Sequence, residues 1–306
     1  MTARLLDGRD LASHLRRELL HRVERLTGGD PDAAPRLAIL RSGDSNGAAL
    51  YARGLERAAR SVGVEPVLLV DETDALLRRM DELNADPRIA GIVVATPVGD
   101  PEHGRALVES IDPFKDVDGA TPTNAGWLAR GEPAFVPATA LAVIAILEAY
   151  EVPVAGRRAV IIGRSAVVGR PVASLFVARD ATTVICHRAT RNLARETRRA
   201  EILVSAAGVG GLVRPEMVNR SAVIVDCGIN AAPGGGIVGD VEFATVAPVV
   251  SAISPVPGGV GPVTPMMVLR QTVESAERGA PPSTSGPIIS STGTDPSMNP
   301  RERIVS

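Results

Sequence analysis

Residues 159–178 constrain the fold more than any other stretch of the sequence. Their first four residues, Ala-Val-Ile-Ile, predict a buried parallel strand. Gly163 and Gly169 then bracket a tight turn that opens a helix at 171–178. Such a corner directs backbone N–H groups and the positive end of the helix dipole at one point, which suits a phosphate. Ser165 stands where a dinucleotide fingerprint has its second glycine, so an ordinary strand–turn–helix corner without a ligand remains an alternative.

The pattern of apolar residues along the rest of the chain predicts an α/β fold. Strands that alternate with helices are expected to form parallel sheets. A long helix at 139–150 leads into the glycine-bracketed turn, so a domain boundary is expected near residue 138. Strands are expected at 37–40, 64–70, 89–95, 182–186, 202–205 and 222–227, and further helices at 9–26, around Tyr51, at 74–83 and at 265–278.

Composition excludes several classes of partner. A net charge of -2 gives no electrostatic reason to bind nucleic acid or a membrane surface. No apolar run is long enough to span a membrane, and the first residues lack the apolar core of a signal peptide. The two cysteines, Cys186 and Cys227, form neither a disulfide framework nor a metal motif. A soluble cytoplasmic protein without a metal is therefore expected.

Side chains that could transfer protons are few. Arginine almost wholly replaces lysine, and Lys115 is the one lysine in the chain. Because arginine stays protonated, it cannot act as a general base. The remaining candidates are four histidines and two tyrosines: His14, His21, His103, His187, Tyr51 and Tyr150.

The strand at 182–186 favours NADP over NAD. In an NAD site, an acidic residue at the end of this second strand binds the ribose hydroxyl. Here the strand is followed by His187 and Arg188, with no acid through Arg191. An arginine at this point suits a 2′-phosphate. A solvated basic loop is the alternative interpretation.

Glycines follow the later strands as well. The strand at 202–205 is followed by Ala206-Ala207-Gly208, and the strand at 222–227 by Gly228-Ile229-Asn230. The segment 255–264 is a glycine–proline loop with little side-chain bulk, which would let a ligand approach the backbone closely.

Five motifs in order along the chain resemble the methylenetetrahydrofolate dehydrogenase/methenyltetrahydrofolate cyclohydrolase (FolD) family. The resemblance covers residues 5–279. The motifs are Lys115-Asp116-Val117-Asp118-Gly119, Gly163-Arg164-Ser165 with Val168-Gly169-Arg170-Pro171, Asp226-Cys227-Gly228-Ile229-Asn230, Val238-Gly239-Asp240-Val241, and Pro255-Val256-Pro257-Gly258-Gly259-Val260-Gly261-Pro262.

The resemblance implies two α/β domains that meet at a cleft, in a homodimer. Residues 1–138 would form the folate-binding catalytic domain, completed by the returning helix 265–279. Residues 139–264 would form a Rossmann-type NADP-binding domain. Residues 280–306, rich in proline, serine, threonine and glycine, are expected to be a disordered tail.

The resemblance also implies roles for individual residues, with a tetrahydrofolate derivative as substrate. Tyr51 would line the folate pocket, and Asp118 would anchor the pterin, with a turn-capping aspartate as the alternative for Asp118. Pro257, Gly258 and Gly259 would shape the floor of the pocket. The implied NADP-binding residues are Gly163, Arg164, Ser165, Gly169, His187, Arg188, Gly208 and Ile229.

The sequence departs from the family where proton transfer is concerned. The family's Tyr-x-x-x-Lys places both side chains on one helix face, but the lysine position is Leu55. The family glutamine that partners this lysine is Ala95, and its Pro-Cys-Thr-Pro segment reads Pro-Ala-Thr-Ala at 137–140.

These departures affect the two family reactions unequally. Hydride transfer from the methylene carbon to the nicotinamide needs two aligned molecules and no obligatory base. The cyclohydrolase reaction must activate water, which normally needs a titratable side chain. Our hypothesis from the sequence is an NADP-dependent dehydrogenase with weak or absent cyclohydrolase activity, in which Tyr51 and Asp118 are the catalytic residues.

Two alternatives remain open. The chain could keep both activities, with Tyr51 and water compensating for the missing lysine. It could instead be a folate-binding paralogue, repurposed to deliver or sense a one-carbon unit.

Overall fold

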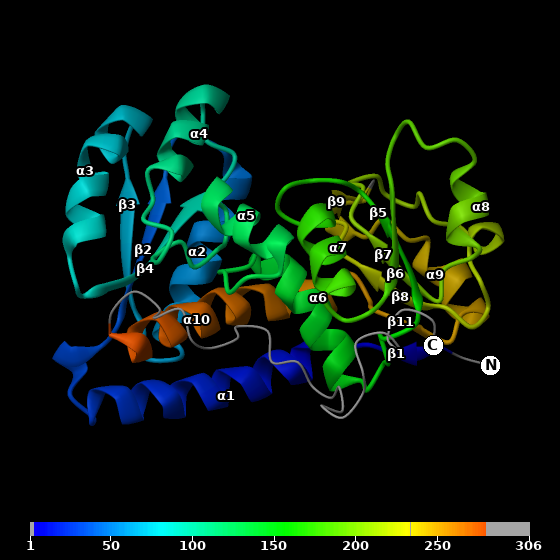
Figure 1. Cartoon of the computed structure of the whole chain (residues 1–306), viewed down its shortest axis with the longest axis horizontal. Coiled ribbons are helices and arrows are strands. Elements are labelled where there is room, and N and C mark those ends of the chain that lie inside the picture. The colour runs from blue at the N-terminus through cyan, green and yellow to red at the C-terminus, as the bar shows by residue number, and fades with distance from the viewer. Residues whose placement is uncertain (1–2, 233, 280–306) are drawn as a thin grey trace, which may run out of the picture.

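The computed structural model describes residues 3–232 and 234–279. It contains two α/β halves, each built on a parallel sheet, as the alternation of strands and helices predicts (Figure 1). The predicted disordered tail at 280–306 lies outside the described residues. Among the described helices, none has the length and apolar character that a membrane crossing requires.

The first half is built on a three-stranded sheet. Its order is β3-β2-β4, with both pairs parallel. Side chains on β2 alternate, so that Leu37 and Ile39 pack toward α2 and α10 while Ala38 and Leu40 pack toward α3 and α4. The elements are β2 (Arg36–Arg41), α2 (Asn46–Arg60), β3 (Glu65–Val70), α3 (Thr73–Ala85), β4 (Ile89–Ala95), α4 (Pro101–Glu109) and α10 (Val260–Arg278).

The second half is built on a six-stranded sheet of order β1-β11-β8-β7-β5-β6, in which every pair is parallel. The chain passes from β5 to β6 on one side and then to β7 on the other. This reversal opens a crevice at the carboxyl ends of β5 and β7, where open α/β sheets bind ligands. The strands are β1 (Arg4–Leu5), β5 (Arg158–Ile162), β6 (Thr182–Cys186), β7 (Ile202–Ser205), β8 (Val223–Asp226) and β11 (Ala252–Ile253).

Further helices and strands complete the described structure. The sequence pattern did not predict α4, α5, β1, β11 or the small hairpin formed by β9 and β10. The remaining helices and strands are α1 (Gly8–Thr27), α5 (Pro122–Arg130), α6 (Ala138–Ala149), α7 (Gly169–Val177), α8 (Leu193–Thr197), β9 (Asn230–Ala231), β10 (Ile237–Val238) and α9 (Phe243–Val246), together with 3₁₀ turns at Pro31–Ala33, Pro215–Met217 and Ala247–Val249.

Both ends of the described chain cross between the halves. Residues 1–138 were expected to lie in one domain, but β1 pairs with β11 in the six-stranded sheet. The chain then enters α1, which runs beneath α10 along the first half (Figure 1). Arg22 of α1 and Glu277 of α10 form an ion pair at 2.7 Å. Because β1 has only two residues, its backbone pairing with a distant strand decides which sheet it joins, and no local sequence pattern encodes that pairing.

The last helix begins earlier than the sequence pattern predicts. Residues 255–264 were expected to form a loop before a helix at 265, but α10 starts at Val260. Pro262 falls in the first turn, where its missing N–H removes no helical bond, although Pro265 lies inside the helix. The glycine–proline loop is therefore shorter than expected and ends at Gly259.

Candidate active site

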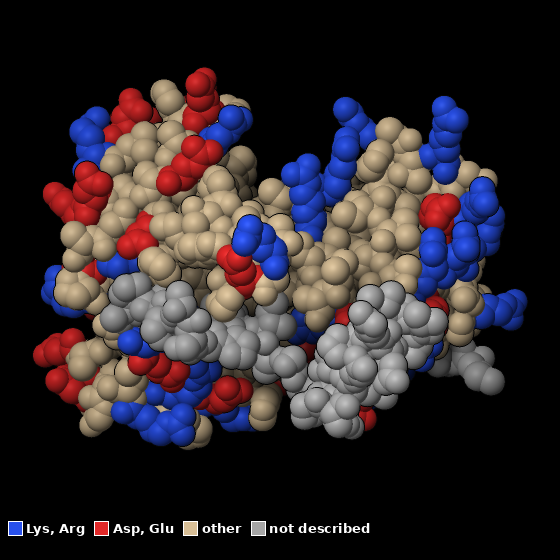
Figure 2. Space-filling model, viewed as in Figure 1, with Lys and Arg blue, Asp and Glu red and all other residues tan. Residues whose placement is uncertain are grey.

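The surface is hollowed between the two halves, and arginine side chains stand along the rim on the side of the six-stranded sheet (Figure 2). The carboxyl ends of β5 and β7, where the strand order reverses, belong to this half. We call it the nucleotide side of the site, and the side with Tyr51 and Asp118 the folate side.

The glycine turn, residues 163–169, fits a bound phosphate. Gly163 has φ +122°, and a Cβ atom there would overlap the Ala206 carbonyl oxygen after β7. A Cβ atom on Gly169 would overlap the Gly163 carbonyl oxygen. The Ser165 hydroxyl accepts from the backbone N–H groups of Val168 at 3.1 Å and Gly169 at 3.4 Å, which leaves its own O–H free to donate. The turn is thus tight enough for backbone and hydroxyl donors to reach a phosphate.

Two exposed arginines flank this turn. Arg164 follows β5, and Arg188 follows β6, the neighbouring strand. Within the described residues, neither guanidinium has an ion-pair partner within 4.0 Å. His187 turns back on its own loop, because its Nδ1 accepts from Ala189 N–H at 3.2 Å and Thr190 Oγ1 accepts from its backbone N–H at 2.8 Å. The arrangement presents two free cations beside the end of β6, as a 2′-phosphate requires.

Asp240 holds the loop after β7 in place. Its carboxylate accepts from the backbone N–H groups of Ala207, Gly208 and Val209 at 2.6–3.2 Å. It also accepts from the Ser205 hydroxyl at 3.1 Å and from the side-chain amide of Asn230 at 3.0 Å. Asp240 is fully buried, and these five donors satisfy it.

A second buried carboxylate, Asp226, supports Asp240. It accepts from the backbone N–H groups of Gly228, Asp240 and Val241 at 2.8–3.0 Å. Burial raises the pKa of Asp226 to about 6, against the opposing effect of these hydrogen bonds. Both aspartates occur in motifs quoted above, but the sequence analysis assigns no role to either. Their partners are backbone groups from distant loops, which no residue pattern reveals.

The two carboxylates leave no room for side chains on the glycines beside them. A Cβ atom on Gly228 would overlap the Asp240 carboxylate, and one on Gly239 would overlap the Asp226 carboxylate. The network includes the predicted cofactor residue Gly208. It also holds Gly228 and Asn230, which flank the predicted cofactor residue Ile229, and Ile229 is 73% exposed in the loop after β8.

On the folate side, Tyr51 and Asp118 lie close enough to interact electrostatically. Burial, and then the charge of Asp118, raise the pKa of Tyr51. Burial raises the pKa of Asp118 to about 7, and its one hydrogen bond to a described residue comes from Ala138 N–H at 3.3 Å. A half-buried carboxylate with a single long hydrogen bond has oxygen lone pairs left for a ligand.

The turn-capping alternative describes Asp116 and not Asp118. Asp116 is fully buried and accepts from the backbone N–H groups of Ala120 and Thr121 at 2.8–2.9 Å. The Asn124 side chain donates a third hydrogen bond to it at 2.9 Å. Asp116 therefore closes the turn.

The positions matched to the family lysine and glutamine are part of the apolar core. Leu55 is 1% exposed and Ala95 is 0% exposed, and both belong to the cluster that includes Val93 and Val117. Neither can donate or accept a proton. Gln271 of α10 is a buried amide, and its side chain donates to the backbone carbonyl oxygen of Val117.

Lys115 does not replace the missing lysine. Its ammonium group donates to the carbonyl oxygens of Leu83 at 3.1 Å and Asp86 at 2.7 Å, at the end of α3. Leu83 packs on the face of the sheet opposite Leu55. Lys115 therefore stabilises the end of α3, a position that suits a cation.

The glycine–proline loop packs onto the start of α1. Gly8 N–H donates to the Gly258 carbonyl oxygen at 2.7 Å, and the Arg9 guanidinium lies where a Cβ atom on Gly258 would be. Gly258 and Gly259 are buried, whereas Pro257 is exposed. The two glycines thus bring this loop close to α1, and their predicted role as the floor of a folate pocket stays a prediction.

A cavity of about 580 Å³ lies elsewhere, at the amino ends of β2 and β4. Lys115, Phe114 and Arg278 are among the residues that line it. It includes neither Tyr51 nor Asp118. In the described part of the chain, no cluster of three or more histidine, cysteine or acidic side chains is arranged to hold a metal ion.

Comparison with known proteins identifies the family. Residues 6–118 match the catalytic domain of tetrahydrofolate dehydrogenase/cyclohydrolase, and residues 137–280 match its NAD(P)-binding domain. The chain is 43% identical over 284 residues to the bifunctional protein FolD 1 of Saccharopolyspora erythraea, covering 90% of this chain and 95% of that protein.

Solved structures agree with these matches. The bifunctional FolD enzyme of Campylobacter jejuni has a TM-score of 0.85 and 38% identity, over 90% of this chain and 98% of that one. The FolD enzyme of Trypanosoma brucei, solved with NADP and an inhibitor, has a TM-score of 0.84 and 35% identity, over 91% and 98% of the two chains. With both domains matched in order along one chain, this protein belongs to the tetrahydrofolate dehydrogenase/cyclohydrolase (FolD) family of enzymes.

Proposed function

We propose that this chain oxidises 5,10-methylenetetrahydrofolate to 5,10-methenyltetrahydrofolate with NADP, and that it also hydrolyses the methenyl product. The relatives named as bifunctional favour this alternative over the single-activity hypothesis drawn from the sequence. The observation that carries the proposal is Asp118, a half-buried carboxylate beside Tyr51 that has one long hydrogen bond and a pKa near neutrality.

The dehydrogenase reaction depends on alignment. NADP, when bound, supplies the acceptor for the hydride. The glycine turn would hold its phosphates, and Arg164 and Arg188 would bind the 2′-phosphate through charge-assisted hydrogen bonds. Asp118 would bind the pterin ring, and Tyr51 would cover one side of the pocket. Because the substrate nitrogen stabilises the cation that forms, orientation by these residues is sufficient.

The cyclohydrolase reaction needs a group that accepts a proton near neutral pH. A water oxygen bonds to the methenyl carbon while one of its protons passes to the Asp118 carboxylate. Asp118 then returns this proton to a ring nitrogen as the bond from that nitrogen to carbon breaks. The hydroxyl group on the carbon releases its own proton to solvent as the C=O bond forms, which leaves a formyl group and one proton in solution. A carboxyl with a pKa of about 7 is suited to both transfers.

A second candidate function is the dehydrogenase alone. The burial of Leu55 and Ala95 in the apolar core favours it, because no polar atom replaces the family lysine and glutamine. In that case Asp118 would bind the pterin without transferring a proton.

Two assays on the purified full chain distinguish these functions. NADPH formation is followed by its absorbance with methylenetetrahydrofolate and NADP, and loss of methenyltetrahydrofolate is followed separately. We expect NADPH formation and a methenyl hydrolysis rate clearly above that of buffer. Hydrolysis at the buffer rate would favour the single-activity candidate, and binding of tetrahydrofolate without any NADPH would favour the repurposed paralogue.

The variant Leu55→Lys refines the result. Under our proposal it gains little cyclohydrolase rate, because Asp118 already transfers the proton. A gain of about 10²-fold or more would instead assign the reaction to the lysine position and leave the wild-type chain a dehydrogenase. Leu55→Met, which keeps the volume and adds no charge, is the matched control.

We also propose a homodimer, as the family resemblance implies. The edge strand β6 and the neighbouring helix α7 expose Ile185 and Val177, and Val177 is 63% exposed. Light scattering on Val177→Glu is expected to give a monomer. Val70→Glu, at a 52% exposed position on the edge strand β3 of the other sheet, is expected to leave the dimer intact.

A further inference from the structure

Asp118 has little that holds it in place through its own side chain. Its carboxylate accepts one hydrogen bond, from Ala138 N–H at 3.3 Å. Its position therefore depends on the backbone of residues 117–119 and on the segment 135–138 that supplies the donor. These two segments lie in direct contact, because a Cβ atom on Gly119 would come within 2.8 Å of backbone atoms of Phe135, Val136 and Pro137.

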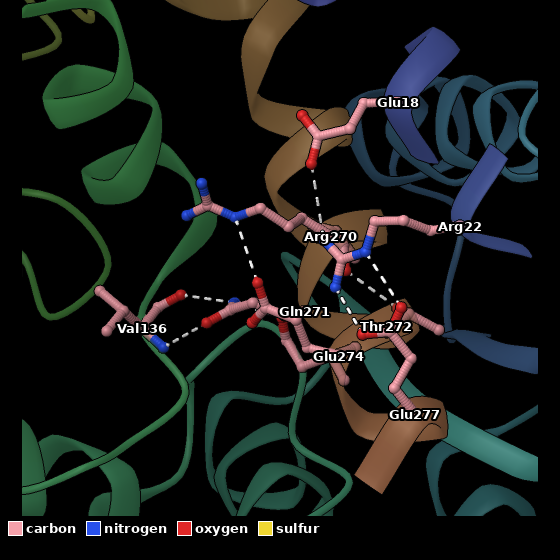
Figure 3. Close-up of polar contacts among 10 residues, drawn as sticks. Glu18, Arg22, Val136, Arg270, Gln271, Thr272, Glu274 and Glu277 are labelled. Atoms are coloured by element: carbon pink, nitrogen blue, oxygen red, sulfur yellow. Dashed lines mark hydrogen bonds and ion pairs between the residues drawn. The ribbon is translucent and has the colours of Figure 1, made fainter. Parts of the chain in front are cut away.

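One side chain, Gln271 of α10, bonds to both segments. Its Nε2 donates to the Val117 carbonyl oxygen at 2.7 Å and to the Val136 carbonyl oxygen at 2.9 Å. Its Oε1 accepts from Val136 N–H at 2.9 Å. Figure 3 shows the two contacts with Val136 as a pair of dashed lines, with the amide aimed from α10 at the loop before α6.

Helix α1 holds the C-terminal part of α10 in place through an ion pair. Arg22 of α1 forms ion pairs with Glu277 at 2.7 Å and with Glu18 of its own helix at 3.7 Å, as Figure 3 also shows. Gln271 is 1% exposed, so each of its three hydrogen bonds is shielded from water. Because α10 is held in place by α1, the Gln271 amide can keep segments 117–119 and 135–138 at a constant separation.

We propose that Gln271 is a positioning residue, which sets the place of Asp118 in the folate pocket by tying the backbone at Val117 to the backbone at Val136. The inference rests on the proposed role of Asp118 in binding the pterin. It gives α10, the helix that returns from the nucleotide half, an indirect part in folate binding.

An amide is the only side chain of this length that can supply these contacts. Leucine at position 271 would leave two carbonyl oxygens and one N–H buried without partners. Glutamate has the same shape but would place a carboxylate against the two carbonyl oxygens. Both variants should release the two segments. The neighbouring variant Thr272→Val removes one buried hydrogen bond, from Thr272 Oγ1 to the Val268 carbonyl oxygen, and removes no hydrogen bond to either segment.

The test compares Gln271→Glu, Gln271→Leu and Thr272→Val in the full chain. We expect the Gln271 variants to raise KM for methylenetetrahydrofolate by about tenfold or more, because small misplacements in a site have large effects. KM for NADP should change by less than about twofold, and Thr272→Val should change neither constant. Gln271→Asn, which keeps the amide one carbon shorter, provides a milder variant if the others do not fold, and the same ordering is expected.

Two results would overturn the inference. One is an unchanged KM for the folate in a folded Gln271 variant. The other is an equal rise in Thr272→Val at a matched loss of melting temperature, which would mean that general loosening of α10 is responsible. Calorimetric titration with 5-formyltetrahydrofolate measures folate binding directly. It therefore decides the role of Gln271 even if the wild-type chain produces no NADPH and the proposed function fails.

Discussion

Asp118 and Asp240 are two aspartates at the same cleft with opposite surroundings. Asp118, on the folate side, accepts one hydrogen bond at 3.3 Å, and burial raises its pKa to about 7. Asp240, on the nucleotide side, is fully buried and accepts five hydrogen bonds from two segments of chain. An unsatisfied carboxylate is available to a ligand, whereas a fully satisfied one fixes the backbone around it.

The comparison separates binding from positioning. On the folate side, we propose that Asp118 binds the substrate and that Gln271 positions it from a distance. On the nucleotide side, we propose that backbone groups and exposed arginines bind the cofactor, while the buried Asp226 and Asp240 hold the loops after β8 and β7 in place. We therefore expect the two aspartates to respond differently to the same conservative substitution.

The largest effect is expected from Asp118→Asn. It should lower the rate of methenyl hydrolysis by about 10²–10³-fold, since the group that accepts the proton is lost. At pH 8 its melting temperature should equal or exceed that of the wild type, because a buried ionised carboxyl is removed. Rate and thermal unfolding are measured on the same preparation. A variant that hydrolyses the methenyl substrate at the wild-type rate, or whose melting temperature falls strongly, would contradict the assignment of Asp118 as a binding and not a positioning residue.

Asp240→Asn should show the reverse pattern. Its amide would direct N–H groups at backbone donors, and we expect unfolding to become easier by about 3 kcal/mol. Urea titration measures this loss. In the folded variant, KM for NADP should rise while KM for the folate stays near the wild-type value. Equal changes in both KM values would mean that Asp240 stabilises the half with the six-stranded sheet without setting the shape of the loop after β7.

The pH dependence of stability sharpens the contrast further. The pKa values of Asp226 and Asp118 are raised in the folded chain to about 6 and about 7, from 3.8 for an unperturbed aspartate. Their contribution to stability is therefore complete below about pH 4 and is lost as the pH rises through 6 and 7. We expect the free energy of unfolding to fall by on the order of 4 kcal/mol between pH 5 and pH 8 from this source.

Urea titrations at several pH values measure this fall. Asp118→Asn should reduce it between pH 6 and pH 8, because one of the two titrating groups is absent. If the free energy of unfolding of the wild type rises between pH 6 and pH 8, with the same slope in the variant, neither carboxyl dominates the pH dependence of stability.

The smallest effect is expected from Arg188→Ala. Removing one exposed cation near the 2′-phosphate should raise KM for NADP by about tenfold and leave KM for NAD nearly unchanged. Arg199→Ala, an exposed arginine in the same half after α8, is the matched control and should change neither. Equal KM changes for NADP and NAD would instead support the solvated basic loop.

The sequence predicted the fold class and the nucleotide corner because both depend on local patterns. Short apolar runs that alternate with helical periodicity indicate parallel sheets. Gly163 and Gly169 mark the turn because only glycine avoids the carbonyl oxygens of Ala206 and Gly163. The family motifs likewise lie in short stretches that can be read along the chain.

Other features could not be predicted, because they depend on residues far apart in the sequence. Asp116 and Asp118 stand in the same short motif, yet one closes a turn and the other remains open to a ligand. Nothing in the sequence indicated a role for Lys115, the one lysine, and its position at the end of α3 follows from the packing of the loop after α4.

The sequence by itself thus determined the two parallel-sheet halves, the glycine turn and the family, since each follows from the residue types in a short stretch. Only the tertiary structure decided that β1 joins the distant sheet, that five donors converge on Asp240, and that Gln271 reaches the backbone beside Asp118. The physical reason is that a buried polar group must find its hydrogen-bond partners wherever the fold brings them, and those partners lie tens to more than a hundred residues away.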